Sequence, residues 1–135
     1  MSFVLDTSVT MAWLFEDEAS RKTESLLDRL STEEALVPTL WTYEVGNVLL
    51  MAERRKRITE AQGKRFAHLL QSLPIRVSDP QPKLLWGNAV VVAREYGLSV
   101  YDGTYLDLAM QQGMPLATRD KALIKAAKKA GVTIC

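Results

Sequence analysis

Four acidic residues are placed where a chain of alternating strands and helices can bring them together. Two of them follow short apolar runs: Asp6 comes after Phe3–Leu5, and Asp120 comes soon after Leu116–Thr118. Two carboxylates about 4 Å apart repel each other by about 4 kcal/mol at an effective dielectric constant of about 20. A divalent cation would offset that repulsion. The candidate metal ligands are therefore Asp6, Glu44, Asp102 and Asp120.

Few other side chains offer an alternative chemistry. His68 is the sole histidine and falls within an expected helix, away from the acids, which excludes a histidine pair of the metal-free ribonuclease type. Ser-His-Asp and Cys-His schemes fail for the same reason. Cys135 is the sole cysteine, so the chain can form no internal disulfide and no cysteine-based metal site, and it suits a reducing compartment. No glycine-rich phosphate loop is present, and metal-assisted hydrolysis remains.

Composition points to one globular domain covering residues 1–135. The chain is 47% hydrophobic and 24% charged, with a formal net charge of +1, which argues against a polycationic coat for nucleic acid. Asp6 interrupts the first apolar stretch too early for a signal peptide, and no run has the length of a membrane span. A cytoplasmic protein with no membrane partner is expected.

Short apolar runs alternate with longer helical patterns. Expected strands cover residues 3–5, 35–37, 75–77, 115–118 and 132–134. Expected helices cover residues 8–15, 21–30, a stretch from Pro38 and Thr39 onward, 59–71, 84–96, 101–112 and 121–129, with a turn at 78–82. Thr59 and Gln62 form a capping-box pattern, and Gly97 and Gly113 each follow a helix. This alternation predicts an α/β fold whose parallel sheet is covered by helices on both faces.

Such a sheet determines where a site would form. Ligands of open parallel sheets bind beyond the carboxyl ends of the strands, and Asp6 and Asp120 both fall at such ends. Glu44 lies about one turn into the helix after the second strand, beside a buried stripe that includes Val45. Asn47 follows three positions later on the same side of that helix, so Glu44 and Asn47 can point together.

Each candidate also has a purely structural interpretation. Asp6, Asp102 and Asp120 stand at helix starts, where an Asp can simply cap exposed N–H groups. Glu44 is not in a capping position. The hydroxyl residues Thr7, Ser8 and Thr118 either orient the carboxylates or serve as ordinary turn and cap residues.

The chain resembles the PIN-domain ribonucleases, specifically the VapC toxins, over essentially its whole length. The residues that carry the resemblance are Asp6-Thr7-Ser8 after a first strand, Glu44 with Asn47 in a helix, Tyr101-Asp102 followed by Tyr105-Leu106 and Ala109, and Leu116-Ala117-Thr118-Arg119-Asp120. The resemblance implies a five-stranded parallel sheet in the order 3-2-1-4-5, with the first and fourth strands adjacent. Asp6 and Asp120 would then be neighbours.

The resemblance also implies a metal-dependent endoribonuclease. The four acids would hold one or two Mg²⁺ or Mn²⁺ ions, directly or through waters, and a water would attack the RNA phosphodiester. Thr7, Ser8, Asn47 and Thr118 would support the acids. VapC-like toxins are typically homodimers and are silenced by an antitoxin protein that lies across the active-site groove, so both partners are expected here.

Several basic and acidic residues near the expected site have to be sorted. Arg119, Lys121 and Lys125 are candidates for holding substrate phosphates. The basic run at 54–57 either contacts phosphates or forms a solvated helix end. The acids that we expect to stay outside the pocket are Asp107, which points elsewhere on its helix, Asp79, which belongs to the turn, and Glu16, Asp17 and Glu18, which form a loop that could line the rim of the cleft. Trp13, Trp41 and Trp86 are expected in the core or a subunit interface.

Two other classes compete with a toxin nuclease. A receiver-like signalling module also binds Mg²⁺ on a five-stranded α/β fold, but its Lys after the fifth strand is missing here. A phosphatase of the haloacid-dehalogenase type needs Asp-x-Asp after the first strand, and position 8 is Ser. A PIN-fold nuclease that processes RNA outside any toxin system stays open as an alternative.

Overall fold

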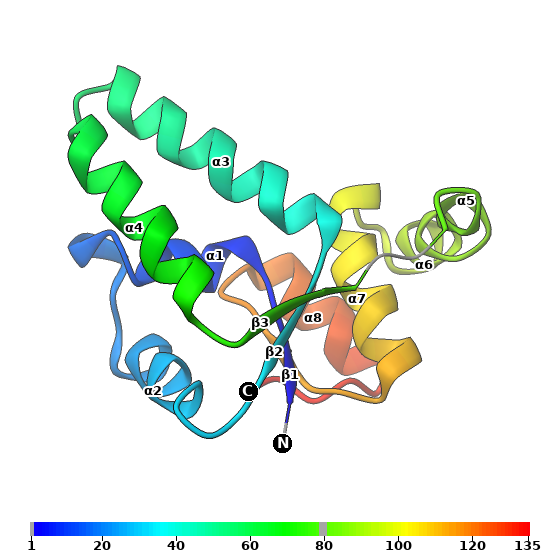
Figure 1. The fold of residues 1–135 in the computed structure, drawn as a ribbon. Helices are drawn as coiled ribbons and strands as arrows, with labels where there is room; N and C mark the ends of the chain where they lie inside the picture. Colours follow the sequence, from blue (N-terminus) through cyan, green and yellow to red (C-terminus); the bar gives the residue numbers. More distant parts are fainter. Residues whose placement is uncertain (1, 79–80) are drawn as a thin grey trace.

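The computed structural model describes residues 2–78 and 81–135 as an α/β unit built on a parallel sheet (Figure 1). The strands are β1 (Phe3–Leu5), β2 (Ala35–Pro38), β3 (Ile75–Ser78) and β4 (Leu116–Ala117), in the order β3-β2-β1-β4. The order differs from the receiver-like order 2-1-3-4-5, in which the first strand lies beside the third. Asp79, assigned to a turn from the sequence, lies outside the described residues.

The central strand explains why its sequence is apolar throughout. Val4 of β1 pairs with Leu36 on one side and with Leu116 on the other, so β1 is covered by strands at both edges and by helices on both faces. All three residues of β1 are 0% exposed. Strands buried on both faces lose the alternation of polar and apolar residues that half-exposed strands show.

Nine helical segments are described in the same ranges. They are α1 (Thr7–Ala12), the 3₁₀ turn η1 (Glu16–Glu18), α2 (Arg21–Arg29), α3 (Thr39–Arg54), α4 (Glu60–Ser72), α5 (Leu84–Gly87), α6 (Ala89–Tyr96), α7 (Val100–Gln112) and α8 (Lys121–Lys129). Helices α3 and α4 form an antiparallel pair that extends past the carboxyl ends of the strands, whereas α5 and α6 project to the side beyond α7 (Figure 1). None of these described helices is both long and apolar enough to cross a membrane.

The local signals in the sequence set most helix boundaries. The capping box of Thr59 and Gln62 opens α4, with each side chain bonded to the other residue's backbone N–H. Gly97 ends α6 with a φ of 67°, and Gly113 ends α7 with a φ of 63°. This left-handed conformation costs glycine little, because it has no Cβ. These three predictions are confirmed.

Helix α7 is held close to α6 by a glycine. A Cβ at Gly103 would lie 2.9 Å from the carbonyl oxygen of Ala89 and 2.9 Å from the Cβ of Ala93, so only glycine allows this approach. The packing matters for the site because α7 carries Asp102 and Tyr105.

Two predictions about the elements are wrong. The expected fifth strand at residues 132–134 forms only an isolated parallel bridge between Leu116 and Ile134, because its backbone hydrogen bonds, from Leu116 N–H to Thr133 and from Cys135 N–H to Leu116, pair it with a single residue of β4. The expected single helix at residues 84–96 is divided at Asn88, whose ψ is −74°. Gly87 and Asn88 are both weak helix formers, which favours a break at that point.

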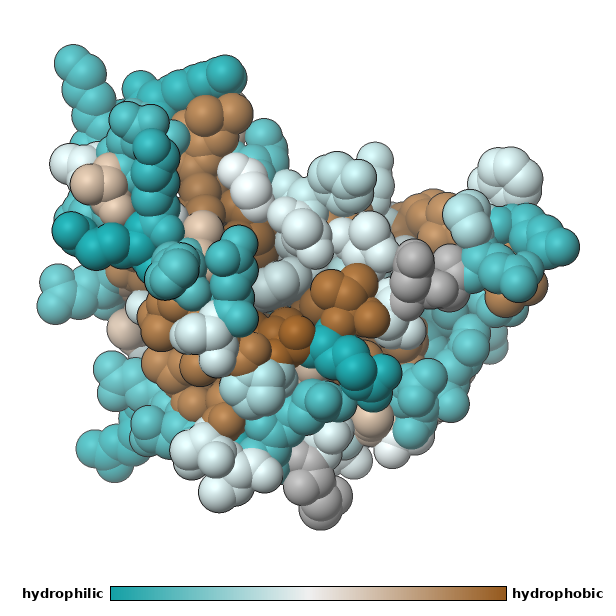
Figure 2. All heavy atoms as spheres, viewed as in Figure 1, coloured by the Kyte–Doolittle hydropathy of each residue, from teal (hydrophilic) through white to brown (hydrophobic). Residues whose placement is uncertain are grey.

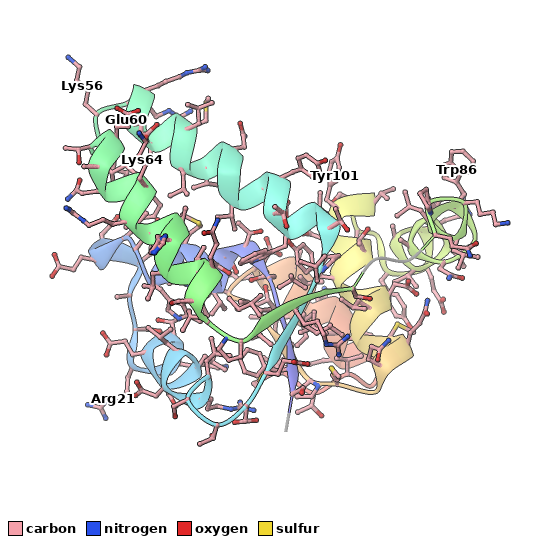
Figure 3. The ribbon with its side chains drawn as sticks, viewed as in Figure 1. Arg21, Lys56, Glu60, Lys64, Trp86 and Tyr101 are labelled. Carbon is pink, nitrogen blue, oxygen red and sulfur yellow. The ribbon has the colours of Figure 1, made fainter. Side chains whose placement is uncertain are left out.

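The three tryptophans occupy different environments. Trp41 is buried and donates its indole N–H to Thr10 Oγ1 at 2.9 Å, and the half-buried Trp13 donates to the carbonyl oxygen of Thr23 at 2.8 Å. Trp86 on α5 is 74% exposed and points away from the rest of the protein (Figure 3). Trp86 is therefore not in the core, and of the two predicted positions only a subunit interface remains possible for it.

Candidate active site

Asp6 lies at the end of the buried strand β1 and begins α1. Its Oδ1 accepts hydrogen bonds from Ser8 Oγ at 2.7 Å and from the backbone N–H of Val9 at 3.1 Å, and its Oδ2 accepts one from Thr118 Oγ1 at 2.5 Å. The residue is 5% exposed. Asp6 thus caps α1, as the structural interpretation expected. Capping uses only Oδ1, which accepts the N–H of Val9, and Oδ2 takes no part in it.

Two hydroxyl groups tie Asp6 to the loop after β4. Thr118 Oγ1 accepts the backbone N–H of Asp120 at 3.1 Å while it donates to Asp6. Ser8 Oγ accepts the backbone N–H of Arg119 at 2.9 Å while it donates to Asp6. Because β1 and β4 are adjacent, residues more than a hundred positions apart meet in one hydrogen-bond network.

Burial dominates the ionisation of Asp6. Desolvation raises the pKa of Asp6 from its ordinary value of 3.8 to about 6, against the hydrogen bonds from Thr118, Ser8 and Val9, which lower it. The charge of Asp102 raises the pKa further. A buried carboxylate with three donors and a raised pKa is only partly compensated, and a nearby cation would favour its ionised form.

Glu44 is oriented by two hydroxyl groups from different elements. Its Oε1 accepts hydrogen bonds from Thr7 Oγ1 at 2.9 Å and from the Tyr105 hydroxyl at 2.5 Å. Burial and the bond to Glu44 raise the pKa of Tyr105 well above its ordinary range, so the phenol stays a donor. Tyr105 is one of the residues that carry the family resemblance, but the sequence predicted no role for it. Its position one turn after Asp102 on α7 is the signal that could have found it.

Asp102 lies in the first turn of α7 but does not cap it. Ser99 is the cap, and its Oγ accepts the backbone N–H of Asp102 at 3.1 Å. The structural interpretation of Asp102 as a cap is therefore wrong. Burial raises the pKa of this half-buried carboxyl, and the charges of Asp120 and Glu44 raise it further.

Asp120 caps α8 and faces solvent. Its Oδ1 accepts the backbone N–H of Leu123 at 2.9 Å, which leaves Oδ2 for other ligands. Asn47 is exposed on α3, one turn after Glu44. The structure therefore brings Asp6, Glu44, Asp102 and Asp120 to the carboxyl edge of the sheet, where the charge of Asp102 raises the pKa of Asp6 and the charges of Asp120 and Glu44 raise the pKa of Asp102.

The donor set suits a hard divalent cation. All four side chains offer carboxylate oxygens, which Mg²⁺ and Mn²⁺ prefer. Within residues 2–78 and 81–135, no group of three or more His, Cys, Asp or Glu side chains is arranged to hold a metal ion. Mg²⁺ commonly binds only one or two carboxylates directly and keeps several waters.

The basic residues near the site differ in their contacts. Arg119 Nη1 binds Glu18 Oε1 at 3.1 Å, whereas Lys121 and Lys125 are exposed on α8. In the basic run, the exposed Arg57 forms ion pairs with Asp17 and Glu18 of η1. Asp107 accepts the side-chain amide of Gln111 at 2.9 Å, on the far side of α7 from Asp102.

A groove lies beside the site on the helical pair. Its lining residues include Trp41, Val45, Leu49, Leu70, Ile75 and Val77, from α3, α4 and β3. Figure 2 shows hydrophobic residues gathered between α3 and α4. The groove starts at the end of α3 that carries Glu44.

Comparisons with known proteins agree with this architecture. Exonuclease VapC9 of Pyrobaculum aerophilum is 31% identical over 99 residues, which are 73% of this chain and 71% of that protein. The solved structure of VapBC2 from Rickettsia felis, bound to a DNA fragment from its promoter, superposes with a TM-score of 0.72 at 12% identity, over 100% of this chain and 98% of that one.

VapC20 from Mycobacterium tuberculosis, described as a sarcin-ricin loop cleaving toxin, superposes with a TM-score of 0.64 at 15% identity, over 92% of this chain and 94% of that one. Both solved structures share the fold at low identity. The PIN domain family itself matches residues 3–129. With this match and the relative of 31% identity, the chain belongs to the PIN domain family.

Proposed function

We propose that the protein is a divalent-metal-dependent endoribonuclease of the cytoplasm that acts as the toxin of a toxin–antitoxin pair. The observation that carries the proposal is the convergence of four acids at the carboxyl edge of the sheet, where the charge of Asp102 raises the pKa of Asp6 and the charges of Asp120 and Glu44 raise the pKa of Asp102. Carboxylates whose charges raise the pKa of their neighbours in a partly buried site would be stabilised by a cation.

When bound, Mg²⁺ or Mn²⁺ would activate a water and neutralise charge on the phosphate. The protein's own side chains fix the geometry. Ser8 and Thr118 hold both oxygens of Asp6, and Thr7 and Tyr105 hold one oxygen of Glu44, so the other oxygen of Glu44 stays available. Asp102 and Asp120 complete the negative pocket from the starts of α7 and α8.

The proposal of RNA as the substrate rests on the names of the relatives and on the acidic site, which suits metal-assisted hydrolysis of a phosphodiester. Among the relatives compared, one is called an exonuclease and another a toxin that cleaves the sarcin-ricin loop. The first name supports a second candidate function, removal of nucleotides from an end. Growth on induction distinguishes a toxin, which should arrest it, from a nuclease that processes RNA, which should not.

The test compares the wild-type protein with Asp6→Asn on linear and circular RNA in Mg²⁺, in Mn²⁺ and in EDTA. We expect the wild type to cleave both RNAs in either metal and the variant and the EDTA sample to cleave neither. Cleavage of linear RNA alone would replace the endonuclease by an exonuclease. Undiminished cleavage by Asp6→Asn would refute the assignment of the site, and growth arrest on induction would separate a toxin from a processing enzyme.

An antitoxin and a second copy of the chain are the proposed protein partners. The apolar groove between α3 and α4 supports the first, because an extended segment could lie along the helix that carries Glu44 and place an Arg or Lys among the acids. Leu84, Trp86 and Val91 on α5 and α6 are 46%, 74% and 46% exposed, which supports a homodimer through this side. Light scattering of Trp86→Glu against the wild type tests the dimer, and an unchanged mass of a dimeric protein would exclude this surface.

A further inference from the structure

One carboxylate outside the acidic pocket binds two arginines from distant parts of the chain. Glu18, in η1, accepts a hydrogen bond from Arg119 through Oε1 at 3.1 Å and one from Arg57 through Oε2 at 3.0 Å. Arg119 belongs to the loop after β4, and Arg57 lies in the turn between α3 and α4. Each oxygen of Glu18 therefore serves a different arginine.

The backbone and the side chain of Arg119 are held by different groups. Its backbone N–H donates to Ser8 Oγ, which in turn donates to Asp6, so the main chain of Arg119 is fixed at the acidic pocket. Its guanidinium instead binds Glu18. A guanidinium carries five N–H donors, and this contact engages a single nitrogen of the group.

If Arg119 leaves Glu18, the carboxylate of Glu18 still has Arg57 as a partner. Arg57 binds Glu18 and both carboxylate oxygens of Asp17, at 2.7 and 2.9 Å, and its guanidinium stacks 3.6 Å above the ring of Phe15. Arg57 is therefore fixed independently of Arg119. The side chains of Arg119 and Glu18 are 37% and 29% exposed, so water can reach the pair that would break.

We propose that Glu18 holds Arg119 in reserve and that a phosphate of the bound RNA displaces Glu18 from it, so that Arg119 binds the phosphodiester beside the acids. This inference rests on the proposed ribonuclease function. Four carboxylates repel a phosphodiester, and an arginine whose backbone is already fixed at the pocket can offset that repulsion with a two-pronged contact. Arg57 keeps Glu18 paired during the exchange.

The test measures KM and kcat for cleavage of a fluorescein-labelled, mixed-sequence single-stranded RNA in Mg²⁺. Glu18→Gln removes the internal competitor, and we expect KM to fall by about 1.5- to 5-fold, the equilibrium worth of an exposed ion pair, with kcat little changed. Arg119→Gln should raise KM by about tenfold or more. The double variant should match Arg119→Gln alone, because the competitor then has nothing to release.

Glu34→Gln is the matched control. Glu34 forms an exposed ion pair with Arg76 at 2.9 Å, at the start of β2 and away from the pocket, and its replacement changes the net charge equally. An equal fall of KM in this control would overturn the proposal, since overall charge would explain both. A rise of KM in Glu18→Gln would also overturn it, because Glu18 would then position Arg119 for binding.

Different results would refute the proposed function and the inference about Arg119. A wild-type protein that cleaves no RNA refutes the proposed function and the inference with it. A wild type that cleaves RNA, with KM unchanged in a folded Glu18→Gln variant, refutes the inference alone. Circular dichroism establishes that each variant is folded.

Discussion

Replacing Asp6 by Asn should stabilise the metal-free protein at neutral pH. The pKa of Asp6 is raised from 3.8 to about 6 by burial, so the folded state binds its proton more tightly than the unfolded chain does. The stability that this carboxyl contributes is full below about pH 4 and is lost as the pH rises through about 6. A shift of this size corresponds to about 3 kcal/mol at pH 7.

Asparagine removes the charge and keeps most of the contacts. Its oxygen can accept from Ser8 and Val9, whereas its amide reverses the bond to Thr118, which costs about 1 kcal/mol. We expect the free energy of unfolding of Asp6→Asn to exceed that of the wild type by about 2 kcal/mol at pH 7. Near pH 4 the advantage should be gone.

Urea unfolding followed by circular dichroism at pH 4, 5, 6 and 7, in EDTA, measures the difference. Asp120→Asn is the control, because Asp120 is exposed and Asn caps a helix as well as Asp does, so its free energy of unfolding should change by less than about 0.5 kcal/mol. Mg²⁺ should then stabilise the wild type more than Asp6→Asn. A difference between Asp6→Asn and the wild type that does not grow from pH 4 to pH 7 would refute the reasoning.

Two further substitutions test how the site is positioned. Tyr105→Phe removes the hydroxyl that binds Glu44 and preserves a ring that is 2% exposed, so kcat should fall by about tenfold or more while the fold is retained; unchanged kinetics, measured with circular dichroism as a check, would show that Glu44 needs no such anchor. Gly103→Ala brings a Cβ to 2.9 Å from the Ala89 carbonyl oxygen and should lower the free energy of unfolding by about 1–3 kcal/mol in a urea titration. Gly46→Ala on α3 is the control, because nothing lies within 4 Å of its new Cβ. It should raise the free energy of unfolding by about 0.5–1 kcal/mol. Equal effects at both glycines would contradict the close contact of α6 with α7.

Local features of the fold could be predicted from the sequence. The apolar run of β1, the capping box at Thr59 and the glycines after α6 and α7 depend on neighbouring residues, and the structure has them where they were expected. The errors arose where tertiary context decides. Whether residues 132–134 form a strand depends on how many of their backbone groups pair with β4, which local propensity does not report.

The candidate site divides in the same way. The four acids could be singled out because they follow strands or flank a buried helical stripe. Their supports could be anticipated less well, since Tyr105 reaches Glu44 across 61 positions and Arg119 reaches Glu18 across 101 positions. Spacing along α7 can place Tyr105 one turn after Asp102, but it does not give the partner of Tyr105 or of Arg119, because those partners depend on which strands become neighbours. The roles of the acids and of Asn47 stay predictions.

The position of β4 beside β1 also affects when during synthesis the pocket can form. Thr118 pairs with Asp6 across 112 positions, and Asp120 follows it, so a ribosome must translate almost the entire PIN domain before these groups can meet. At about 5–20 residues per second the nascent chain spends several seconds with Asp6 exposed to water and without its partners. A ribosome-stalled chain that ends at residue 115 is expected to show no nuclease activity, and activity in that chain would show that β4 is dispensable. Strand order would thus delay the assembly of the acidic pocket until nearly the whole domain has left the ribosome.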